Sequence, residues 1–314
     1  MDPGSGRPLE PDTGSSFLPG LLGPSRVKGI MLVATAGALW STLGLGVRIM
    51  DSSTPWQILF YRAVPQLVFI TIWVAMRRGH NLVRSFTDIG LNGVLAGACV
   101  SMSSIAFVNA LTLITVAEAM FIFSMAPILA GLLGWLVLRE PITRITWVAM
   151  GLVMVGIGIM NGPGHAEGLS IGTFLAFIGA SGFAGFTVLQ RRRPNIDMLP
   201  AVAVSGLITM ATIGWKTVGV PVPDLTDLLV ALWLGGVALA GGLALYTIGA
   251  RQVRSAESVV ISMTEIILGP VWVWWLLDET VTFAILSGGA VVASGVVIQA
   301  LLNKPTPPDP SPTL

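Results

Sequence analysis

Charged side chains are scarce in this sequence. They make up only 11% of the 314 residues, whereas hydrophobic residues make up 54%. An average soluble domain carries roughly 25% charged residues. The formal net charge of +1 leaves no basic surface of the kind that binds nucleic acid. The composition therefore excludes a soluble globular domain and a nucleic-acid-binding protein.

Cysteine and histidine are almost absent. Cys99 is the only cysteine, so no disulfide within the chain is possible, and a small apolar role inside a helix is expected. The histidines, His80 and His165, fall in predicted loops, and no Cys, His and carboxylate residues have metal-ligand spacing. No Gly-rich phosphate loop with a lysine occurs. The sequence predicts no metal, no cofactor and no ATP hydrolysis.

What the sequence does contain is long apolar runs. Residues 29–47, 145–159 and 284–302 are nearly free of charge and approach the ~20 residues that cross a bilayer as a helix. Charge clusters and Pro, Gly, Asp and Asn breaks divide the chain further. We predict an all-α integral membrane protein with ten transmembrane helices, at about 28–49, 56–76, 89–112, 115–138, 143–161, 169–190, 199–219, 226–250, 255–277 and 280–302.

The boundary between the third and fourth predicted spans has the least support, because residues 113–116 carry no charge. Thr112, Thr115 and Glu118 favour a turn there. A single helix over 89–138 would be about 75 Å long, which is too long for a bilayer. We therefore expect two helices.

The basic residues predict the orientation, because positive loops stay in the cytoplasm. With the N-terminus inside, 14 of the 17 Lys and Arg residues fall on the cytoplasmic side. Only Arg48 and Lys216 fall outside, and Arg62 lies within a span. One missed helix would scramble this asymmetry, so it supports both the number of spans and cytoplasmic termini.

One apolar segment occurs twice in the sequence, in two similar copies. AEAMFIFSMAPILAGLLGWLVLRE begins at Ala117, and AESVVISMTEIILGPVWVWWLLDE begins at Ala256. At a constant offset of 139, without a gap, the two segments share eight residues, among them Trp135 with Trp274 and Glu140 with Glu279. A chance match of two Leu-, Val- and Trp-rich helices is the alternative to a true repeat.

The repeat divides the membrane part into two units of five spans. Residues 28–162 form the first unit and 163–302 the second, between tails at 1–27 and 303–314 that are expected to be flexible and cytoplasmic. The first residues lack the basic and apolar regions of a secretory signal. An odd number of spans places the second unit upside down in the membrane, as in many secondary transporters.

Three segments resemble the EamA family of the drug/metabolite transporter superfamily. They are AGALWST at 36–42, FYRAVPQ around Arg62, and the block 127–143 that runs into a Gly-rich fifth span. The likeness covers about residues 28–302, and the chain looks most like the bacterial YddG-type amino-acid exporters.

The resemblance implies a ten-helix, two-repeat exporter of the bacterial inner membrane with a central cavity. The first, third, fourth, sixth, eighth and ninth spans would face the pathway. The chain departs from the family pattern at Ser41, where a glycine is common after the tryptophan. Pro270 also falls four residues later than the repeat of Pro127 would place it. Both departures bear on the symmetry between the halves.

Glu265 is the deepest ionisable residue, about 15 Å from the cytoplasmic start of the ninth span. Such groups cost about 2.5–3.5 kcal/mol each on insertion scales and are functional candidates. We expect its helical face either to line the substrate cavity, where Glu265 meets a substrate ammonium or carries a proton, or to make a structural hydrogen bond. The face comprises Ser258, Ser262, Glu265, Gly269 and Trp272.

Arg62 and Glu118 are the other charged residues inside predicted spans, at similar depths. Either they form an ion pair that offsets their desolvation, or Arg62 binds a substrate carboxylate. Arg48 and Lys216 are expected to extend to the membrane interface. Glu279, like its counterpart Glu140, is expected to cap a helix or interact with a helix dipole.

Aromatic and small polar side chains supply the remaining candidates for the cavity wall: Trp40, Ser41, Ser101, Ser104, Asn109, Phe123 and Tyr246. For the serines and the asparagine, hydrogen bonds between helices are the competing interpretation. Pro127 and Pro270 are predicted bending points. A ladder of small residues in the sixth span is expected to be a packing seam, formed by Gly172, Ala176, Ala180 and Ala184.

The predicted function is export of amino acids, aromatic and other neutral, and related small metabolites by alternating access. A mostly neutral cavity suits zwitterions better than nucleotide sugars, which need several inward Lys or Arg residues. A drug/metabolite or nucleotide-sugar transporter of the same fold is the alternative, and a membrane-embedded enzyme or lipid-handling scaffold is the alternative from another class. The expected partners are a small-molecule substrate and membrane lipids, with oligomeric state and driving ion left open.

Overall fold

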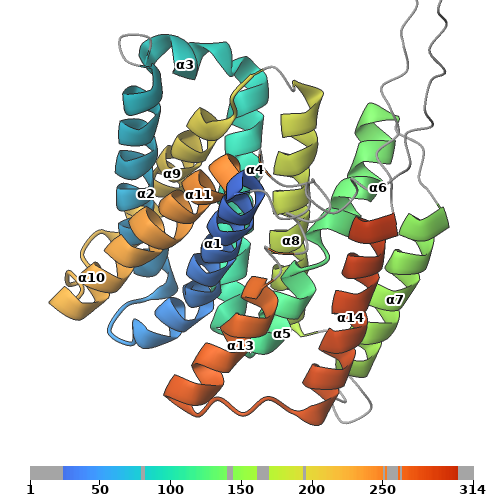
Figure 1. Cartoon of the computed structure of the whole chain (residues 1–314). Helices are drawn as coiled ribbons and strands as arrows, with labels where there is room; N and C mark the ends of the chain where they lie inside the picture. Colours follow the sequence, from blue (N-terminus) through green and yellow to red (C-terminus); the bar gives the residue numbers. More distant parts are fainter. Residues whose placement is uncertain are drawn as a thin grey trace, which may run out of the picture.

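The computed structural model describes residues 24–78, 82–139, 144–160, 170–193, 196–249, 252, 261 and 264–302. Nearly all of these residues are helical (Figure 1). The helices are α1 (Pro24–Ile49), α2 (Pro55–Arg78), α3 (Leu82–Asp88), α4 (Gly90–Leu111), α5 (Val116–Phe123), α6 (Ala126–Leu138), α7 (Arg144–Met160), α8 (Ile171–Arg192), α9 (Leu199–Ile213), η3 (Gly214–Thr217), α10 (Leu225–Leu232), η4 (Trp233–Gly241), α11 (Gly242–Gly249), α13 (Thr264–Leu277) and α14 (Phe283–Leu302).

Within the described part of the chain, seven helical stretches are long and apolar enough to cross a membrane. They are Val27–Ile49, Pro55–Arg77, Gly90–Leu111, Val116–Leu138, Ile171–Arg192, Leu199–Thr217 and Leu225–Gly249. Three further apolar helices are shorter, Arg144–Met160, Thr264–Leu277 and Phe283–Ile298. The protein is therefore an all-helical, multi-pass integral membrane protein.

The weakly supported turn between the third and fourth predicted spans is present. Helix α4 ends at Leu111 and α5 begins at Val116. Thr115 caps α5, because its side-chain oxygen accepts a hydrogen bond from the backbone N–H of Glu118 at 3.2 Å. Thr115, one of the residues that favoured a turn here, therefore caps the helix that follows the turn.

The two predicted bending points differ. The fourth predicted span is interrupted, with α5 ending at Phe123 and α6 beginning at Ala126, and Pro127 lies in the first turn of α6. A proline is tolerated there because the first N–H groups of a helix have no partner within it. Pro270, in contrast, lies inside the continuous helix α13. Of the two prolines, only Pro127 lies at a break in a helix.

The eighth predicted span changes from α-helix to π-helix and back. Between α10 and α11, the nine residues of η4 form a π-helix, rich in glycine and alanine. Gly236 faces the ring of Phe69 of α2, where a side chain would lie only 2.8 Å from an aromatic carbon. π-Helical segments are rare and occur often at functional sites.

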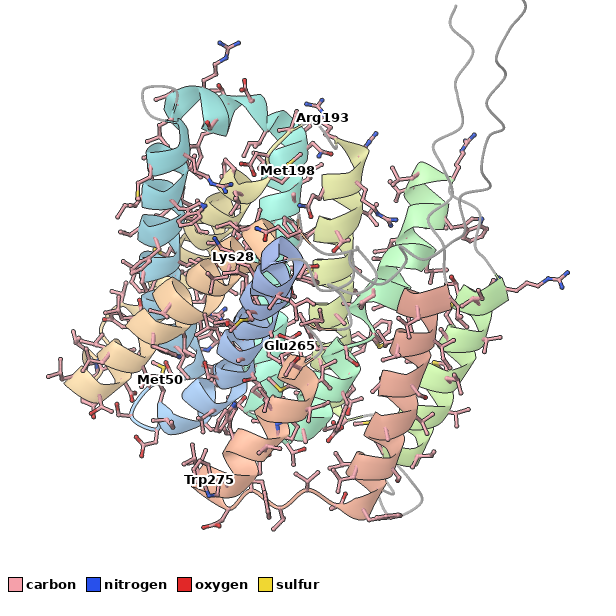
Figure 2. All side chains as sticks on the ribbon, viewed as in Figure 1. Lys28, Met50, Arg193, Met198, Glu265 and Trp275 are labelled. Carbon is pink, nitrogen blue, oxygen red and sulfur yellow. The ribbon has the colours of Figure 1, made fainter. Side chains whose placement is uncertain are left out.

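Labelled residues mark two ends of the helix bundle (Figure 2). Met50 and Trp275 lie toward one end, Arg193 and Met198 lie toward the other, and Glu265 lies between them. We call these the Met50 end and the Arg193 end. The α1–α2 loop and the α4–α5 turn belong to the Met50 end, as do the segments joining α9 to α10 and α13 to α14, since hydrogen bonds connect them there.

The helix contacts follow a regular scheme. Helix α1 packs against η4, α11 and α13, while α8 packs against α4 and against α5 and α6. Helix α2 packs against η4, and α4 packs against α9. Figure 1 shows α2 with α9 and α7 with α14 as neighbours on opposite sides of the bundle. Glycines lie at several of these interfaces, as Gly97 does between α4 and α9 and Gly235 between η4 and α2.

The ladder predicted in the sixth span is a packing seam. Gly172, Ala176, Ala180 and Ala184 of α8 are all buried, and a side chain at Gly172 would lie 2.6 Å from Ile114. Helices α7 and α14 also pack closely at small residues, since a side chain at Gly156 would lie 2.6 Å from the carbonyl oxygen of Gly288. Small residues let backbones approach closely, which is a main source of helix association in lipid.

We predict that Gly156→Ala weakens the contact between α7 and α14 by about 1–3 kcal/mol, because the new methyl group overlaps a backbone carbonyl that cannot move aside. Gly151 and Gly158 of α7 are matched controls, since a side chain at either position meets nothing within 4 Å. Alanine there is expected to be neutral or slightly stabilising. Thermal melting in detergent measures the difference, and equal melting temperatures for all three variants would contradict the interpretation.

Candidate functional site

Ser41 of α1 and Trp272 of α13, both predicted to line the cavity, contact each other. The indole Nε1 of Trp272 donates a hydrogen bond to Ser41 Oγ at 2.9 Å. Ser41 Oγ in turn donates to the carbonyl of Ala38 at 2.6 Å, and the residue is fully buried. The serine that departs from the family pattern thus joins two helices, which is the competing structural role.

Trp40 and Tyr246 form an aromatic pair between α1 and α11. Their ring centroids lie 5.5 Å apart at an interplanar angle of 40°. Trp40 also packs on Gly242, where a side chain would lie 2.5 Å from the indole Nε1. This Nε1 atom is buried and has no hydrogen-bond partner in the described structure.

Glu265 lies in the first turn of α13, between the two ends of the bundle and nearer to Met50 than to Arg193 (Figure 2). Its carboxyl group makes no hydrogen bond or ion pair with another described residue. Among the described residues, no three His, Cys, Asp or Glu side chains gather closely enough to hold a metal ion. Ser258 and Ser262, predicted to share its face, lie outside the described residues.

The ion pair expected between Arg62 and Glu118 is not formed. Glu118 Oε1 accepts a hydrogen bond from the hydroxyl of Thr173, at the start of α8, at 2.9 Å. Arg62 is only 6% exposed, and its Nε has no partner. The sequence placed both residues at a similar depth but held no information on which way the two helices turn them.

The polar residues of α4 serve different roles. Ser101 Oγ shares a hydrogen bond with the hydroxyl of Thr209 of α9 at 2.8 Å, so it joins helices. Asn109 donates to the carbonyl of Ile105 in its own helix at 2.7 Å. Ser104 is partly buried, and none of the described hydrogen bonds involves it. Of the three, only Ser104 keeps its side-chain polar group free.

Phe123 lies in a run of aromatic side chains that crosses from α4 to α8. Its ring centroid is 4.8 Å from that of Phe107 and 5.7 Å from that of Phe183, which lies 6.0 Å from Phe186. Phe123 was predicted from the sequence as a cavity residue, but its aromatic partners were not, because α4, α5 and α8 come together only in the folded chain.

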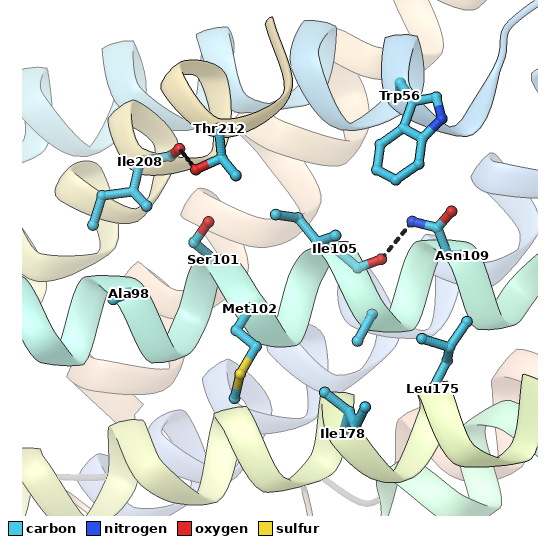
Figure 3. Close-up of a pocket in the computed structure, with 11 residues that line it drawn as sticks. Trp56, Ala98, Ser101, Met102, Ile105, Asn109, Leu175, Ile178, Ile208 and Thr212 are labelled. Atoms are coloured by element: carbon cyan, nitrogen blue, oxygen red, sulfur yellow. Dashed lines mark hydrogen bonds between the residues drawn. The ribbon is translucent and has the colours of Figure 1, made fainter. Parts of the chain in front are cut away.

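A groove of about 590 Å³ lies between α4, α8 and α9, with Trp56 of α2 at one end (Figure 3). Its lining is almost entirely apolar, and the dashed lines in Figure 3 show that Asn109 and Thr212 direct their polar groups to their own helices. The groove contains Ser101 and Asn109 of the predicted set, but not Trp40, Tyr246 or Glu265. It is thus separate from the aromatic pair.

Arg48 and Glu279 form an ion pair at the Met50 end, with Nε and Oε2 3.4 Å apart. Arg48 also donates to the carbonyl of Ile114 at 2.8 Å, and Glu279 Oε1 accepts from the backbone N–H of Val116 at 2.8 Å. We call these four groups the Arg48 cluster. Arg48 therefore does not extend to the interface as expected, whereas Glu279 does cap a helix, the distant α5.

Two further contacts close the same end. Asp227 of α10, 1% exposed, accepts hydrogen bonds from Ser52 at 2.7 Å and Ser53 at 2.5 Å. The Lys216 ammonium lies 3.5 Å from the ring centroid of Trp56, a cation–π contact. No sequence pattern marks Asp227 beyond its place near a helix start. Together with the Arg48 cluster, these contacts tie α1 and α2 to the C-terminal helices.

Comparisons with known proteins identify a similar family, similar sequences and a similar fold. Residues 27–162 match the model of the EamA-like transporter family. The uncharacterized transporter YwfM of Bacillus subtilis (strain 168) is 23% identical over 251 residues, 75% of this chain and 81% of the relative. An uncharacterized transporter of Vibrio cholerae serotype O1 (strain ATCC 39315 / El Tor Inaba N16961) is 23% identical over 198 residues, 56% of this chain and 61% of the relative.

The fold is also similar to that of a protein known from a crystal structure. The TM-score is 0.62 at 19% identity, covering 88% of this chain and 98% of the other. This likeness concerns the fold alone. The family match over residues 27–162 and the transporter relatives show that the chain is similar to EamA-type membrane transporters, and its apolar helices agree with this similarity.

Proposed function

We propose that the protein is a secondary transporter that exports amino acids, aromatic and other neutral, and related small metabolites from the bacterial cytoplasm by alternating access. It would do so with ten spans in two inverted repeats, residues 28–162 and 163–302. The fourth span would comprise α5 and α6, the seventh α9 and η3, and the eighth α10, η4 and α11. The helix contacts are the observation that carries this proposal.

Exchanging each span with the one five places away reproduces the main contacts. The packing of α1 on η4 and α11 becomes that of α8 on α4, and α1 on α13 becomes α8 on α5 and α6. The α2–η4 contact becomes α9–α4, while α2–α9 and α7–α14 exchange with themselves. A dyad between two five-helix units would produce this pattern, and the family match at 27–162 covers the first unit.

The polar groups without partners favour a zwitterionic substrate with an apolar or aromatic side chain. Glu265 offers one carboxylate within the membrane, and Trp40 and Tyr246 offer an aromatic wall with a free indole N–H. Arg48 is engaged by Glu279, and Lys216 by Trp56. This leaves too few inward cations for a nucleotide sugar, whose phosphates need several.

We assign the Met50 end to the outside of the cell, following the distribution of basic residues. In the described arrangement, the Arg48 cluster and the contacts of Asp227 hold the helices together at this end. Alternating access requires that these contacts break when the site opens outward. The Arg48 cluster would therefore act as the outer closure of the pathway.

One observation favours a function from another class. The apolar groove between α4, α8 and α9 is a feature that a lipid-handling scaffold would need. It lacks a polar group free to hold a lipid headgroup along its lining, because Asn109 and Thr212 bond within their own helices. Movement of labelled phospholipid in the liposomes described below separates this alternative from transport.

We predict that the purified protein in liposomes loaded with unlabelled phenylalanine or leucine takes up the same labelled amino acid by counterflow. Labelled nucleotide sugars and cationic drugs should give no more uptake than protein-free liposomes. The reason is that, in the part of the chain that the structure describes, few charges within the membrane lack a protein partner, among them those of Arg62 and Glu265. Absence of counterflow with every amino acid tested would refute the substrate assignment, and lipid movement without counterflow would favour the scaffold.

Glu265→Gln is expected to lower the apparent affinity for amino acids by about 10- to 100-fold, because a neutral amide replaces the charged partner of the ammonium. Affinity for the matching hydroxy acid, which lacks the ammonium, should change little. Asp278→Asn is the matched control, since Asp278 is exposed and has φ +52°, a conformation that asparagine adopts readily. Export of every substrate at the original rate and pH dependence would exclude Glu265 from transport.

Glu279→Gln should loosen the outer closure, because it removes the charge that attracts Arg48 but retains an oxygen for the Val116 amide. For a partly exposed pair worth up to about 1 kcal/mol, we expect roughly 2- to 5-fold faster labelling from outside. The probe is a membrane-impermeant thiol reagent on Leu45→Cys in a Cys99→Ala background. Asp278→Asn is again the control, and unchanged labelling would mean that the Arg48 cluster does not hold this end closed.

A further inference from the structure

The guanidinium of Arg62 is the largest unexplained polar group in the structure. Arg62 is 6% exposed, its Nε is buried without a partner, and no hydrogen bond or ion pair reaches its side chain from any described residue. A buried charge without a partner strongly destabilises a fold. Such a group in a membrane span is expected to serve a ligand.

We propose that Arg62, with Ser104, binds the carboxylate of the transported substrate. This inference rests on the proposed function and adds to it the residues that recognise one end of the substrate. Three features support this site: the carboxylates of Glu118, Asp227 and Glu279 are engaged elsewhere, Arg62 and Ser104 lie equally far along α2 and α4 from the Met50 end, and their donors match a carboxylate.

The carboxylates of Glu118, Asp227 and Glu279 at the Met50 end have other partners. Glu118 accepts from Thr173, Asp227 accepts from Ser52 and Ser53, and Glu279 pairs with Arg48. The next polar residue on α2, Gln66, donates to the Val202 carbonyl at 2.9 Å and to Ser205 Oγ at 3.0 Å. None of these groups supplies an anion for Arg62.

The helix register brings Arg62 and Ser104 to the same level. Arg62 is seven residues from the first residue of α2, and Ser104 is seven residues from the last residue of α4, so both lie about 10 Å from the Met50 end. One turn nearer that end, Leu59 of α2 belongs to the same buried cluster as Val108 of α4. Arg62 and Ser104 share the helix faces of these two residues, since the spacings are three and four.

The local structure holds Arg62 rigidly. Gly235 of η4 packs directly on the backbone carbonyl of Arg62, so close that any side chain at 235 would overlap it. The π-helical segment thus fixes the α2 backbone at this residue. A guanidinium presents two parallel N–H groups that match the two oxygens of a carboxylate, and the free hydroxyl of Ser104 supplies a further donor.

The two charged groups would also orient the substrate. Glu265 of α13 lies between the two ends of the bundle (Figure 2), and Arg62 lies seven residues from the start of α2. An amino acid would therefore bind with its carboxylate at Arg62 and its ammonium at Glu265.

The test compares an amino acid with its own carboxamide, which keeps the ammonium and side chain but lacks the anionic group. In counterflow by full-length protein in liposomes, Arg62→Met should weaken phenylalanine about 10- to 100-fold and phenylalaninamide less than about 3-fold. Ser104→Ala should weaken phenylalanine about 3- to 10-fold. Arg62→Lys should restore part of the preference, since it keeps the charge without the two parallel N–H groups.

Melting in detergent distinguishes ligand binding from a structural role. Arg62→Met should melt at the wild-type temperature or above, because it removes a buried charge that has no protein partner. Lys216→Met is the matched control, as it removes a cation that lies over Trp56, and it should leave the preference for the amino acid unchanged.

Two results would overturn the assignment of Arg62 alone: wild-type counterflow with the same ratio of amino acid to carboxamide in Arg62→Met, or loss of both substrates together with a lowered melting temperature. If the wild-type protein shows no amino-acid counterflow, the proposed substrate and this inference both fail. A selective loss of phenylalanine with unchanged melting supports the carboxylate site.

Discussion

The absence of water from the bilayer core is the constraint on which this structure depends. A polar group that faces hydrocarbon finds no partner there, so each must be satisfied within the protein. Many hydroxyl groups bond to the carbonyl one turn earlier in their own helix, as in Ser181, Thr187, Thr212 and Ser287. Others join helices, as Ser103 does with the carbonyl of Gly179. Close backbone packing at glycines then provides the association that hydrophobic burial cannot supply in lipid.

Against this background, the polar groups that remain unsatisfied carry information. Trp40 Nε1 and Arg62 Nε are buried without a partner, as is Trp73 Nε1, and the carboxyl group of Glu265 makes no hydrogen bond or ion pair with a described residue. Leaving such groups unpaired costs free energy that helix packing must offset. They belong to α1, α2 and α13, which all contact one another directly or through η4. A ligand that supplies the missing partners would be bound at their common centre.

Hydropathy and capping residues were sufficient to predict an all-helical membrane protein and some of its helix ends, because both depend on neighbouring residues in the sequence. Thr115 and Glu118 located a turn that carries no charge, and the alanine ladder of α8 predicted its buried face. Contacts between segments that are distant in the sequence could not be predicted. Arg48 was expected at the interface and instead pairs with Glu279, and Glu118 bonds to Thr173 rather than to Arg62. Each depends on helix rotation, which hydropathy does not encode.

The site itself was predictable only in part. Trp40 and Tyr246 do meet, but Ser41 and Trp272 use their polar groups on each other, and Ser101 bonds to Thr209. Residue type alone could not separate these cases, since a serine that binds a ligand and one that joins helices look alike in sequence. The π-helical winding of η4 was also invisible, because glycine and alanine fit either winding.

The proposed repeat relates backbones but not chemistry. At the offset of 139, Glu265 corresponds to Ala126, so the two halves would present different groups to a shared centre. Two equivalent bundles would have nearly equal energies in the inward- and outward-facing states, as alternating access requires. Unequal side chains at the centre then let a bound substrate favour one arrangement without altering the framework. The contacts of Arg48 and Asp227 must in turn be weak enough to break, which suits polar contacts at a bundle end better than apolar packing within it.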